Sequence, residues 1–135
     1  MPKETFAARY ENLAQICEFV TIASEAAGLG EADAYCVELA TNEACTNIME
    51  YSYGEDTEGK IECLIEADDK GVTIVLRDWG KPFDANEVPE KTFDKPMEEL
   101  DLRGIGLRLI RGAMDEVEFE ALPVGGNRLT MRKYR

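Results

Sequence analysis

The chain has 135 residues and a formal net charge of −13, from 28 acidic and 15 basic side chains, and it contains no histidine. A chain of this length can bury a real core, so we expect a single domain over residues 1–135. The negative charge argues against nucleic acid and anionic membrane surfaces as partners, and the lack of histidine excludes histidine triads, histidine metal sites and a histidine phosphorelay within the chain.

The N-terminal half predicts one short strand and two helices. The strand covers Glu4–Ala8, and the first helix covers Tyr10–Ala27, where apolar residues recur at helical spacing. Gly28 and Gly30 end this helix. The second helix covers Ala32–Tyr51.

Two polar residues of the second helix are placed unusually. At about 100° per residue, the apolar face of this helix centres on Ala40, and Asn47 falls on that face with Glu43 at its edge. Residues at i and i+4 project the same way. A buried carboxylate and carboxamide need partners, which either a ligand or a neighbouring loop can supply. In the ligand case, one group can take a proton and the other can hold a metal ion.

The C-terminal half predicts a hairpin, a long loop, a third helix and a second hairpin. The long loop, Trp79–Arg103, has three prolines and little periodicity, and a loop of this length in a compact domain is usually functional. The expected elements are strands Lys60–Ala67 and Val72–Asp78, helix Ile105–Met114, and strands Glu116–Leu122 and Asn127–Tyr134. This order favours an α+β fold, a two-layer sandwich with helices on one face of an antiparallel or mixed, mostly antiparallel, sheet.

Strand alternation places two more polar residues on inner faces. Asp78 ends the apolar row of its strand, and Asn127 begins the inner row of the last strand. Each is either a functional group or a strand-end residue that has already reached water.

Two glycine clusters flank the long loop. Asp78-Trp79-Gly80-Lys81-Pro82-Phe83 opens it, and Gly104-Ile105-Gly106-Leu107 closes it and begins a helix. Glycine lets the backbone approach a ligand closely, and helix N-termini favour phosphate. Neither cluster is specific alone, and the chain has no G-x-x-x-x-G-K-[ST] loop.

The order of these pieces is specific. Glu-x-x-x-Asn on a helix, Asp-x-Gly-x-Pro-Phe after a strand, Gly-x-Gly-Leu at a helix start and Gly-Asn-x-Leu in a final strand resembles the GHKL or Bergerat-fold ATPases, which include gyrase, histidine kinases and MutL. Within this superfamily the chain looks most like the stand-alone anti-sigma-factor serine/threonine protein kinases of bacterial partner-switching systems. The resemblance covers almost the whole chain and includes residues 103–110 and 114–117.

The resemblance implies a role for each matching residue in binding ATP or ADP. Asn47 would coordinate Mg²⁺ and Glu43 would act as general base. Asp78 would accept a hydrogen bond from the adenine amino group, and Gly80 would let the base approach. Gly104 and Gly106 would offer N–H groups to the phosphates, and Arg103 would neutralise their charge. Asn127 would lie beside the adenine, and residues 84–102 would form a lid.

The chain also departs from the family pattern. Asn127 stands where many relatives have threonine, and Tyr51 lies where the family often has histidine. Between Asp84 and Asp101 the lid has seven acidic residues and two lysines. Phosphate stabilisation is therefore expected mainly from Mg²⁺, backbone groups and Arg103.

Two functional classes remain open at this stage. The first is an ATP-dependent protein-serine kinase that phosphorylates an anti-anti-sigma protein of the STAS type and sequesters a sigma factor. The second is a nucleotide-gated binding protein that transfers no phosphate; Glu43 favours the first, because binding alone needs no base. We also expect a homodimer, formed near the first strand and helix through Phe6, Tyr10 and Phe19, although these side chains can instead complete the core.

Location and cysteine state complete the expectations. No apolar run reaches the roughly 18 residues that a spanning helix needs, and Met1-Pro2-Lys3-Glu4 lacks the apolar core of a signal peptide. We therefore expect a cytoplasmic protein. The four cysteines show no C-x-x-C spacing, which favours reduced, buried thiols at Cys17, Cys36, Cys45 and Cys63.

Overall fold

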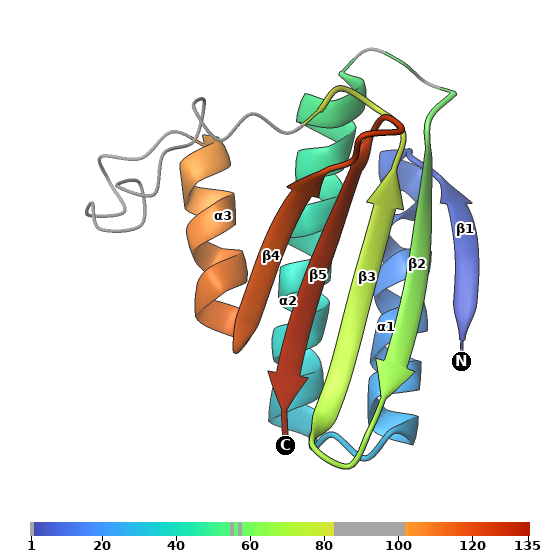
Figure 1. Cartoon of the computed structure of the whole chain (residues 1–135). Helices are drawn as coiled ribbons and strands as arrows, with labels where there is room; N and C mark the ends of the chain where they lie inside the picture. Colours follow the sequence, from blue (N-terminus) through green and yellow to red (C-terminus); the bar gives the residue numbers. More distant parts are fainter. Residues whose placement is uncertain (1, 55, 57, 83–101) are drawn as a thin grey trace.

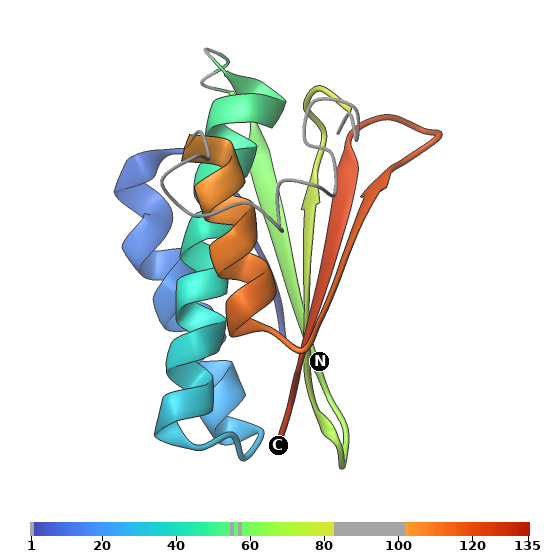
Figure 2. The same ribbon diagram turned by 90° about the vertical axis from the view of Figure 1, so that its left-hand side faces the viewer.

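The computed structural model describes residues 2–54, 56, 58–82 and 102–135, with the backbone alone for residues 102 and 103. The strands form one five-stranded sheet in the order β1-β2-β3-β5-β4, and every pairing in it is antiparallel. Figure 2 shows that the helices cover one face of this sheet and leave the other open. The expected two-layer α+β sandwich is therefore confirmed.

The elements follow the expected order closely. The bounds of all five strands agree with the prediction to within one residue. In chain order, the elements are β1 (Lys3–Ala7), η1 (Tyr10–Asn12), α1 (Leu13–Ala26), α2 (Glu31–Asn47), η2 (Ile48–Tyr53), β2 (Lys60–Ala67), β3 (Gly71–Asp78), α3 (Leu102–Ala113), β4 (Glu116–Ala121) and β5 (Asn127–Tyr134).

Three helix boundaries differ from the sequence expectation by three residues or more. The first helix is expected from Tyr10, but residues Tyr10–Asn12 form the 3-10 turn η1 and α1 begins at Leu13. The second helix does not continue as α-helix to Tyr51: it changes at Ile48 into a π-helical segment, η2. A π-turn closes i→i+5 hydrogen bonds, so each residue rotates through a smaller angle about the helix axis than in an α-turn. Tyr51 therefore leaves the core-facing stripe and is 36 % exposed. The third helix begins at Leu102, three residues earlier than expected.

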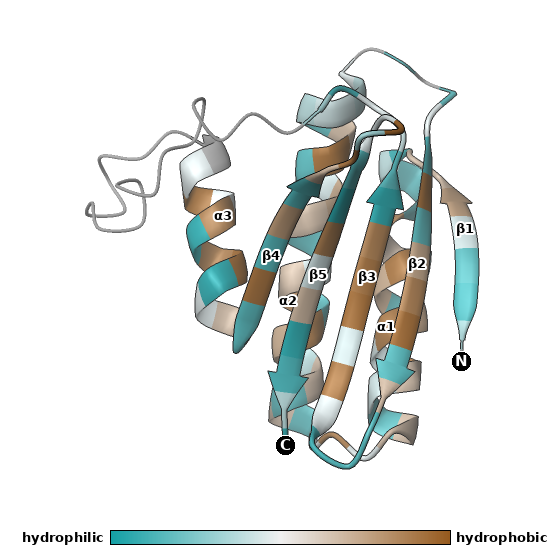
Figure 3. Ribbon diagram, in the orientation of Figure 1, coloured by the Kyte–Doolittle hydropathy of each residue, from teal (hydrophilic) through white to brown (hydrophobic). Residues whose placement is uncertain are grey.

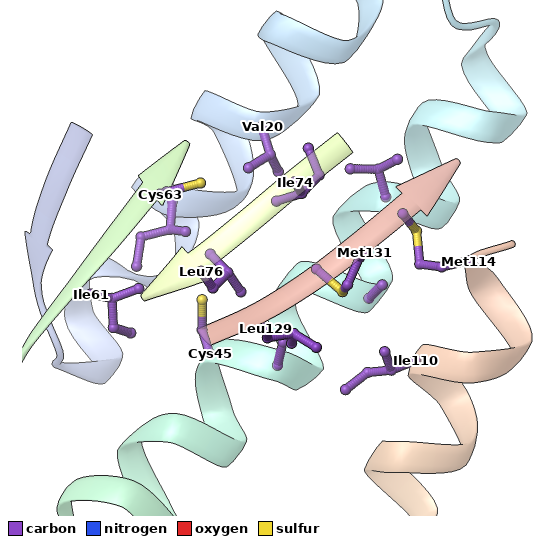
Figure 4. Close-up of a cluster of buried hydrophobic side chains, with 14 of the residues drawn as sticks. Val20, Cys45, Ile61, Cys63, Ile74, Leu76, Ile110, Met114, Leu129 and Met131 are labelled. Carbon is purple, nitrogen blue, oxygen red and sulfur yellow. The ribbon is translucent and has the colours of Figure 1, made fainter. Parts of the chain in front are cut away.

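The core lies between the sheet and the helices. The inner rows of β2, β3 and β5 alternate strictly with outward side chains, as a half-buried sheet requires. Figure 4 shows Ile74, Leu76, Leu129, Met131 and Ile110 in one cluster; each is at most 5 % exposed. In Figure 3 β3 is hydrophobic along most of its length and hydrophilic at its tip.

The aromatic residues near the first strand divide between core and surface. The rings of Phe6 and Phe19 meet edge to face at 6.0 Å and pack against the core. Tyr10 is 57 % exposed and donates a hydrogen bond to Glu50 Oε1. Two of the three side chains thus complete the core, and the expected homodimer stays a prediction.

The cysteines carry free thiols. Cys17, Cys45 and Cys63 are buried and Cys36 is half-buried. Burial raises the pKa of the Cys17 thiol to about 11 and that of the Cys63 thiol to about 12, so the buried thiols behave as small apolar side chains. Among the described residues, no helix is long and apolar enough to cross a membrane.

Candidate functional site

The candidate site lies at one end of the sandwich, where four elements meet. Figure 1 shows η2, the tip of β3, the start of β5 and the start of α3 together at the upper end of the molecule. A cleft of about 550 Å³, including its opening to solvent, lies there. Its walls are apolar and come from Ala44, Ile48, Leu107, Phe119 and Leu129. Its polar groups include Asn47, Ser52, Asp78 and Asn127.

Sheet register brings Asp78 and Asn127 together. They are cross-strand partners in the pairing of β3 with β5, and both lie on the inner face. Asp78 is 2 % exposed and Asn127 is 8 % exposed. The alternative in which these strand-end residues have already reached water is therefore wrong.

The two oxygens of the Asp78 carboxylate have different surroundings. Oδ1 accepts hydrogen bonds from the Gly80 N–H at 2.9 Å and from Asn127 Nδ2 at 3.1 Å. Within the described residues, Oδ2 accepts only from the Ser52 hydroxyl, at 3.4 Å. Burial raises the pKa of Asp78, and these hydrogen bonds offset part of the rise. The carboxylate is held in place while one oxygen keeps acceptor capacity.

Gly80 is required by protein packing. A Cβ built at this position would lie 2.3 Å from the Ser52 carbonyl oxygen, so no other residue fits without movement. The next residue, Lys81, donates its N–H to the same oxygen at 2.6 Å. The residue type expected at this position is thus explained by the close approach of the β3 end to η2.

Glu43 and Asn47 face α3 at Gly106. A Cβ built on Gly106 would lie 3.1 Å from Glu43 Oε2 and 3.8 Å from both terminal atoms of the Asn47 amide. Asn47 lines the cleft, whereas Glu43 lies one turn away, beyond the lining. The glycine therefore lets α3 pass close to the polar pair of α2.

The Asn47 side chain has an orphaned group. Its Nδ2 atom is buried and has no hydrogen-bond partner among the described residues. An unpaired buried amide costs about 1–3 kcal/mol and needs an explanation; a partner that arrives with a ligand supplies one. The amide oxygen is a hard ligand of the kind that Mg²⁺ prefers. Among the described residues, no group of three or more acidic, cysteine or histidine side chains could hold a metal ion.

The remaining predicted residues lie either in the first turns of α3 or outside the described residues. Gly104 is buried in the first turn of α3. Gly106 is the fifth residue of that helix, and only the first four N–H groups of a helix lack intrahelical partners. For Gly106 the close approach to Glu43 is thus the better-supported role. The side chain of Arg103 and the expected lid up to residue 101 lie outside the described residues.

Sequence reasoning missed two residues that assemble the site, Ser52 and Tyr53. Tyr53 Oη donates to the Lys60 carbonyl at 2.6 Å and accepts the Trp79 N–H at 2.9 Å, which joins η2 to both β2 and β3. Gly59 lies under this ring, because a Cβ there would lie 2.6 Å from ring atoms of Tyr53. The one signal in the sequence was the polar-aromatic run after Asn47, which reads as an ordinary helix end.

The close approach at Gly106 predicts a difference between two glycines of α3. Gly112→Ala has nothing within 4 Å of the new Cβ and is expected to stabilise the protein by up to about 1 kcal/mol, from helix propensity. Gly106→Ala should lose this gain, because its Cβ crowds the Glu43 carboxylate. Thermal unfolding of both variants checks this, and equal stabilisation by the two substitutions would contradict the close packing of α3 on Glu43.

Comparison with known proteins identifies the family. The model of the histidine kinase-like ATPase domain matches residues 6–133. The chain belongs to that family. The chain is also similar to the serine-protein kinase RsbW of Bacillus thuringiensis (strain Al Hakam) and of Bacillus anthracis (strain CDC 684 / NRRL 3495), with 35 % identity to each over 86 residues, 61 % of its length. The match covers 53 % of each relative, so the chain spans about half the length of the curated relatives it matches.

Solved structures share the fold of this chain. The RsbU and RsbW domains of Rv1364c from Mycobacterium tuberculosis match with a TM-score of 0.64 at 15 % identity, over 100 % of this chain and 33 % of that one. The catalytic domain of histidine kinase ThkA, in a nucleotide-free form, matches with a TM-score of 0.60 at 17 % identity, over 99 % and 98 %. At these identities the likeness shows that the histidine kinase-like ATPase domain shares its fold with these structures.

Proposed function

We propose that this domain binds ATP with Mg²⁺ and transfers the γ-phosphate to a serine hydroxyl of another protein. The observation that carries the proposal is the arrangement of one cleft, which has a partly satisfied buried carboxylate at Asp78 and an orphaned amide at Asn47. The family and the similarity to serine-protein kinases support it. A kinase needs these two ends, one to recognise the base and one to handle the phosphates.

The Asp78 end suits recognition of adenine. Asp78 Oδ2 retains acceptor capacity, which matches the amino group that adenine presents. Asn127 Nδ2 also donates to the Lys81 carbonyl at 2.8 Å, so it ties Asp78 to the chain that follows β3. The apolar walls of the cleft would enclose the faces of the base.

The Asn47 end suits phosphoryl transfer. Glu43 accepts the proton of the serine hydroxyl, the serine oxygen bonds to the γ-phosphorus, and the bond from that phosphorus to the β–γ bridging oxygen breaks to release ADP. Asn47 would hold Mg²⁺, which when bound neutralises charge on the phosphates. Gly104, in the first turn of α3, and Arg103 are the groups of this chain proposed to face the phosphates.

The partners are proposed from the resemblance to the anti-sigma-factor kinases, which the similarity to RsbW supports. We propose a STAS-type anti-anti-sigma protein as the phosphate acceptor and a sigma factor as the protein sequestered, with a homodimer formed near β1 and α1. The net charge of −13 suits partners with basic surfaces.

Sedimentation at tens of micromolar tests the homodimer separately, and a chain that stays monomeric with ATP and partner present would contradict it.

Incubation with γ-labelled ATP, Mg²⁺ and a STAS-type protein encoded near this gene tests the transfer step. The proposal predicts label on a serine of that protein, dependent on Mg²⁺. Binding of ATP and the partner without transfer of label would favour the alternative, a nucleotide-gated regulator without phosphotransfer activity.

A further inference from the structure

Ser52 places a hydroxyl group at the polar end of the cleft, beside Asp78. The π-helical segment η2 ends one residue later, and π-turns occur often at functional sites. The Ser52 Oγ atom lies 3.4 Å from Asp78 Oδ2 and 3.3 Å from Asn127 Nδ2. It lines the same cleft as both residues.

The bonds of this hydroxyl leave its proton available. Oxygen-to-oxygen hydrogen bonds are usually about 2.7–2.8 Å long, so the contact of 3.4 Å with Asp78 is weak. A serine hydroxyl rotates to suit its surroundings. The two hydrogens of Asn127 Nδ2 have nearer acceptors in the Lys81 carbonyl at 2.8 Å and Asp78 Oδ1 at 3.1 Å, so the contact of 3.3 Å with Ser52 does not fix the hydroxyl. The hydroxyl can therefore turn its proton toward a better acceptor that enters the cleft.

The backbone of Ser52 is fixed independently of its hydroxyl. Its carbonyl oxygen accepts the Lys81 N–H at 2.6 Å, and Gly80 packs directly against it. Removing the hydroxyl group therefore leaves the frame of the site in place. This makes Ser52→Ala a variant that tests hydrogen bonding without removing the packing of η2 on β3.

We propose that Ser52 is a specificity-determining residue that donates a hydrogen bond to the ring nitrogen N1 of adenine, beside the amino group bound by Asp78. This inference rests on the proposed function. Adenine presents an amino donor next to the N1 acceptor, and Asp78 Oδ2 with the Ser52 hydroxyl presents the complementary acceptor and donor. Guanine has the opposite order, a carbonyl oxygen next to an N1–H donor, so its carbonyl oxygen would face the carboxylate.

Comparison of ATP with 1-deaza-ATP, which replaces N1 by a C–H group, tests the inference directly. Calorimetry of the wild-type chain with Mg²⁺ should show ATP binding about 3- to 10-fold more tightly than 1-deaza-ATP, the effect of one neutral hydrogen bond. In Ser52→Ala the two nucleotides should bind equally, because the donor is missing. Ser24→Ala removes a buried hydroxyl of α1 that does not line the cleft. This control variant should keep the wild-type ratio of the affinities for ATP and 1-deaza-ATP.

The outcomes separate this inference from the function on which it rests. A Ser52→Ala variant that weakens both nucleotides alike and keeps their ratio would overturn the contact with N1 and leave Ser52 as a support for Asp78. A wild-type chain that binds both nucleotides equally would also overturn it while leaving ATP binding intact. A wild-type chain that binds neither nucleotide would overturn the proposed function and this inference together.

Discussion

Replacing Glu43 with glutamine is expected to slow phosphoryl transfer to the partner by about 10²-fold or more, the usual contribution of a general base. The amide keeps the size of the side chain but cannot take the proton of the serine hydroxyl. ATP binding should change little, because Glu43 lies beyond the lining of the cleft while Asn47 lies within it. Single-turnover transfer rates with one saturating partner, together with ATP affinity by calorimetry, measure the two effects.

Glu38→Gln provides the matched control for this experiment. Glu38 belongs to the same helix, α2, is also half-buried, and lines the groove that faces α1. The same loss of charge there should leave the transfer rate near that of the wild type. Equal rates for the wild type and Glu43→Gln would remove Glu43 from the role of base. Equal losses in both glutamine variants would instead point to the net charge of the helix.

Replacing Asp78 with asparagine is expected to lower the affinity for ATP by about 10- to 100-fold. This range corresponds to the ~1.5–3 kcal/mol that a hydrogen bond to a charged group contributes. The substitution keeps Oδ1 as the acceptor for Gly80 and Asn127, and the introduced amide nitrogen stands in place of Oδ2. A donor then faces the amino group of adenine. Titration calorimetry with Mg²⁺-ATP measures the loss, and unchanged affinity would remove Asp78 from base recognition.

Two controls show that this loss is local. Asp69→Asn makes the same change of charge in the turn at the opposite end of β3 and should not alter ATP affinity. Asp78→Asn should also fold without loss of stability, because the introduced amide can donate to Ser52.

The folded state raises the pKa of Asp78, so the native wild type binds its proton more tightly than the unfolded chain does. Wild-type stability therefore gains from this group as pH falls, and any advantage of Asp78→Asn at neutral pH should shrink in acid.

The periodicity of the sequence is enough to predict which way the side chains of four site residues point on regular strands and helices. Asp78 and Asn127 were expected on inner faces because side chains alternate strictly along a strand, and the observed register joins them directly. Glu43 and Asn47 were expected to project together, because the α-helix holds its geometry as far as Asn47. Which strands pair, and hence that these two pairs share one end of the molecule, came only from the resemblance and the structure.

The parts that sequence reasoning missed depend on local departures from regular geometry. Ser52 and Tyr53 lie in a π-helical segment, where the rule of about 100° per residue fails. In the sequence Gly80 and Gly106 suggest close approach of the backbone to a ligand, yet their nearest neighbours in the structure are Ser52 and Glu43, respectively. A glycine in a sequence shows that something comes close, and only the packed chain shows what it is.

Titration calorimetry of the wild-type chain with ATP and with ADP, each with Mg²⁺, tests the central claim most directly. The account predicts saturable binding of one adenine nucleotide per chain, with GTP binding more weakly under the same conditions and Asp78→Asn losing most of the preference. No detectable binding of any adenine nucleotide at millimolar concentration would contradict the assignment of this cleft to ATP.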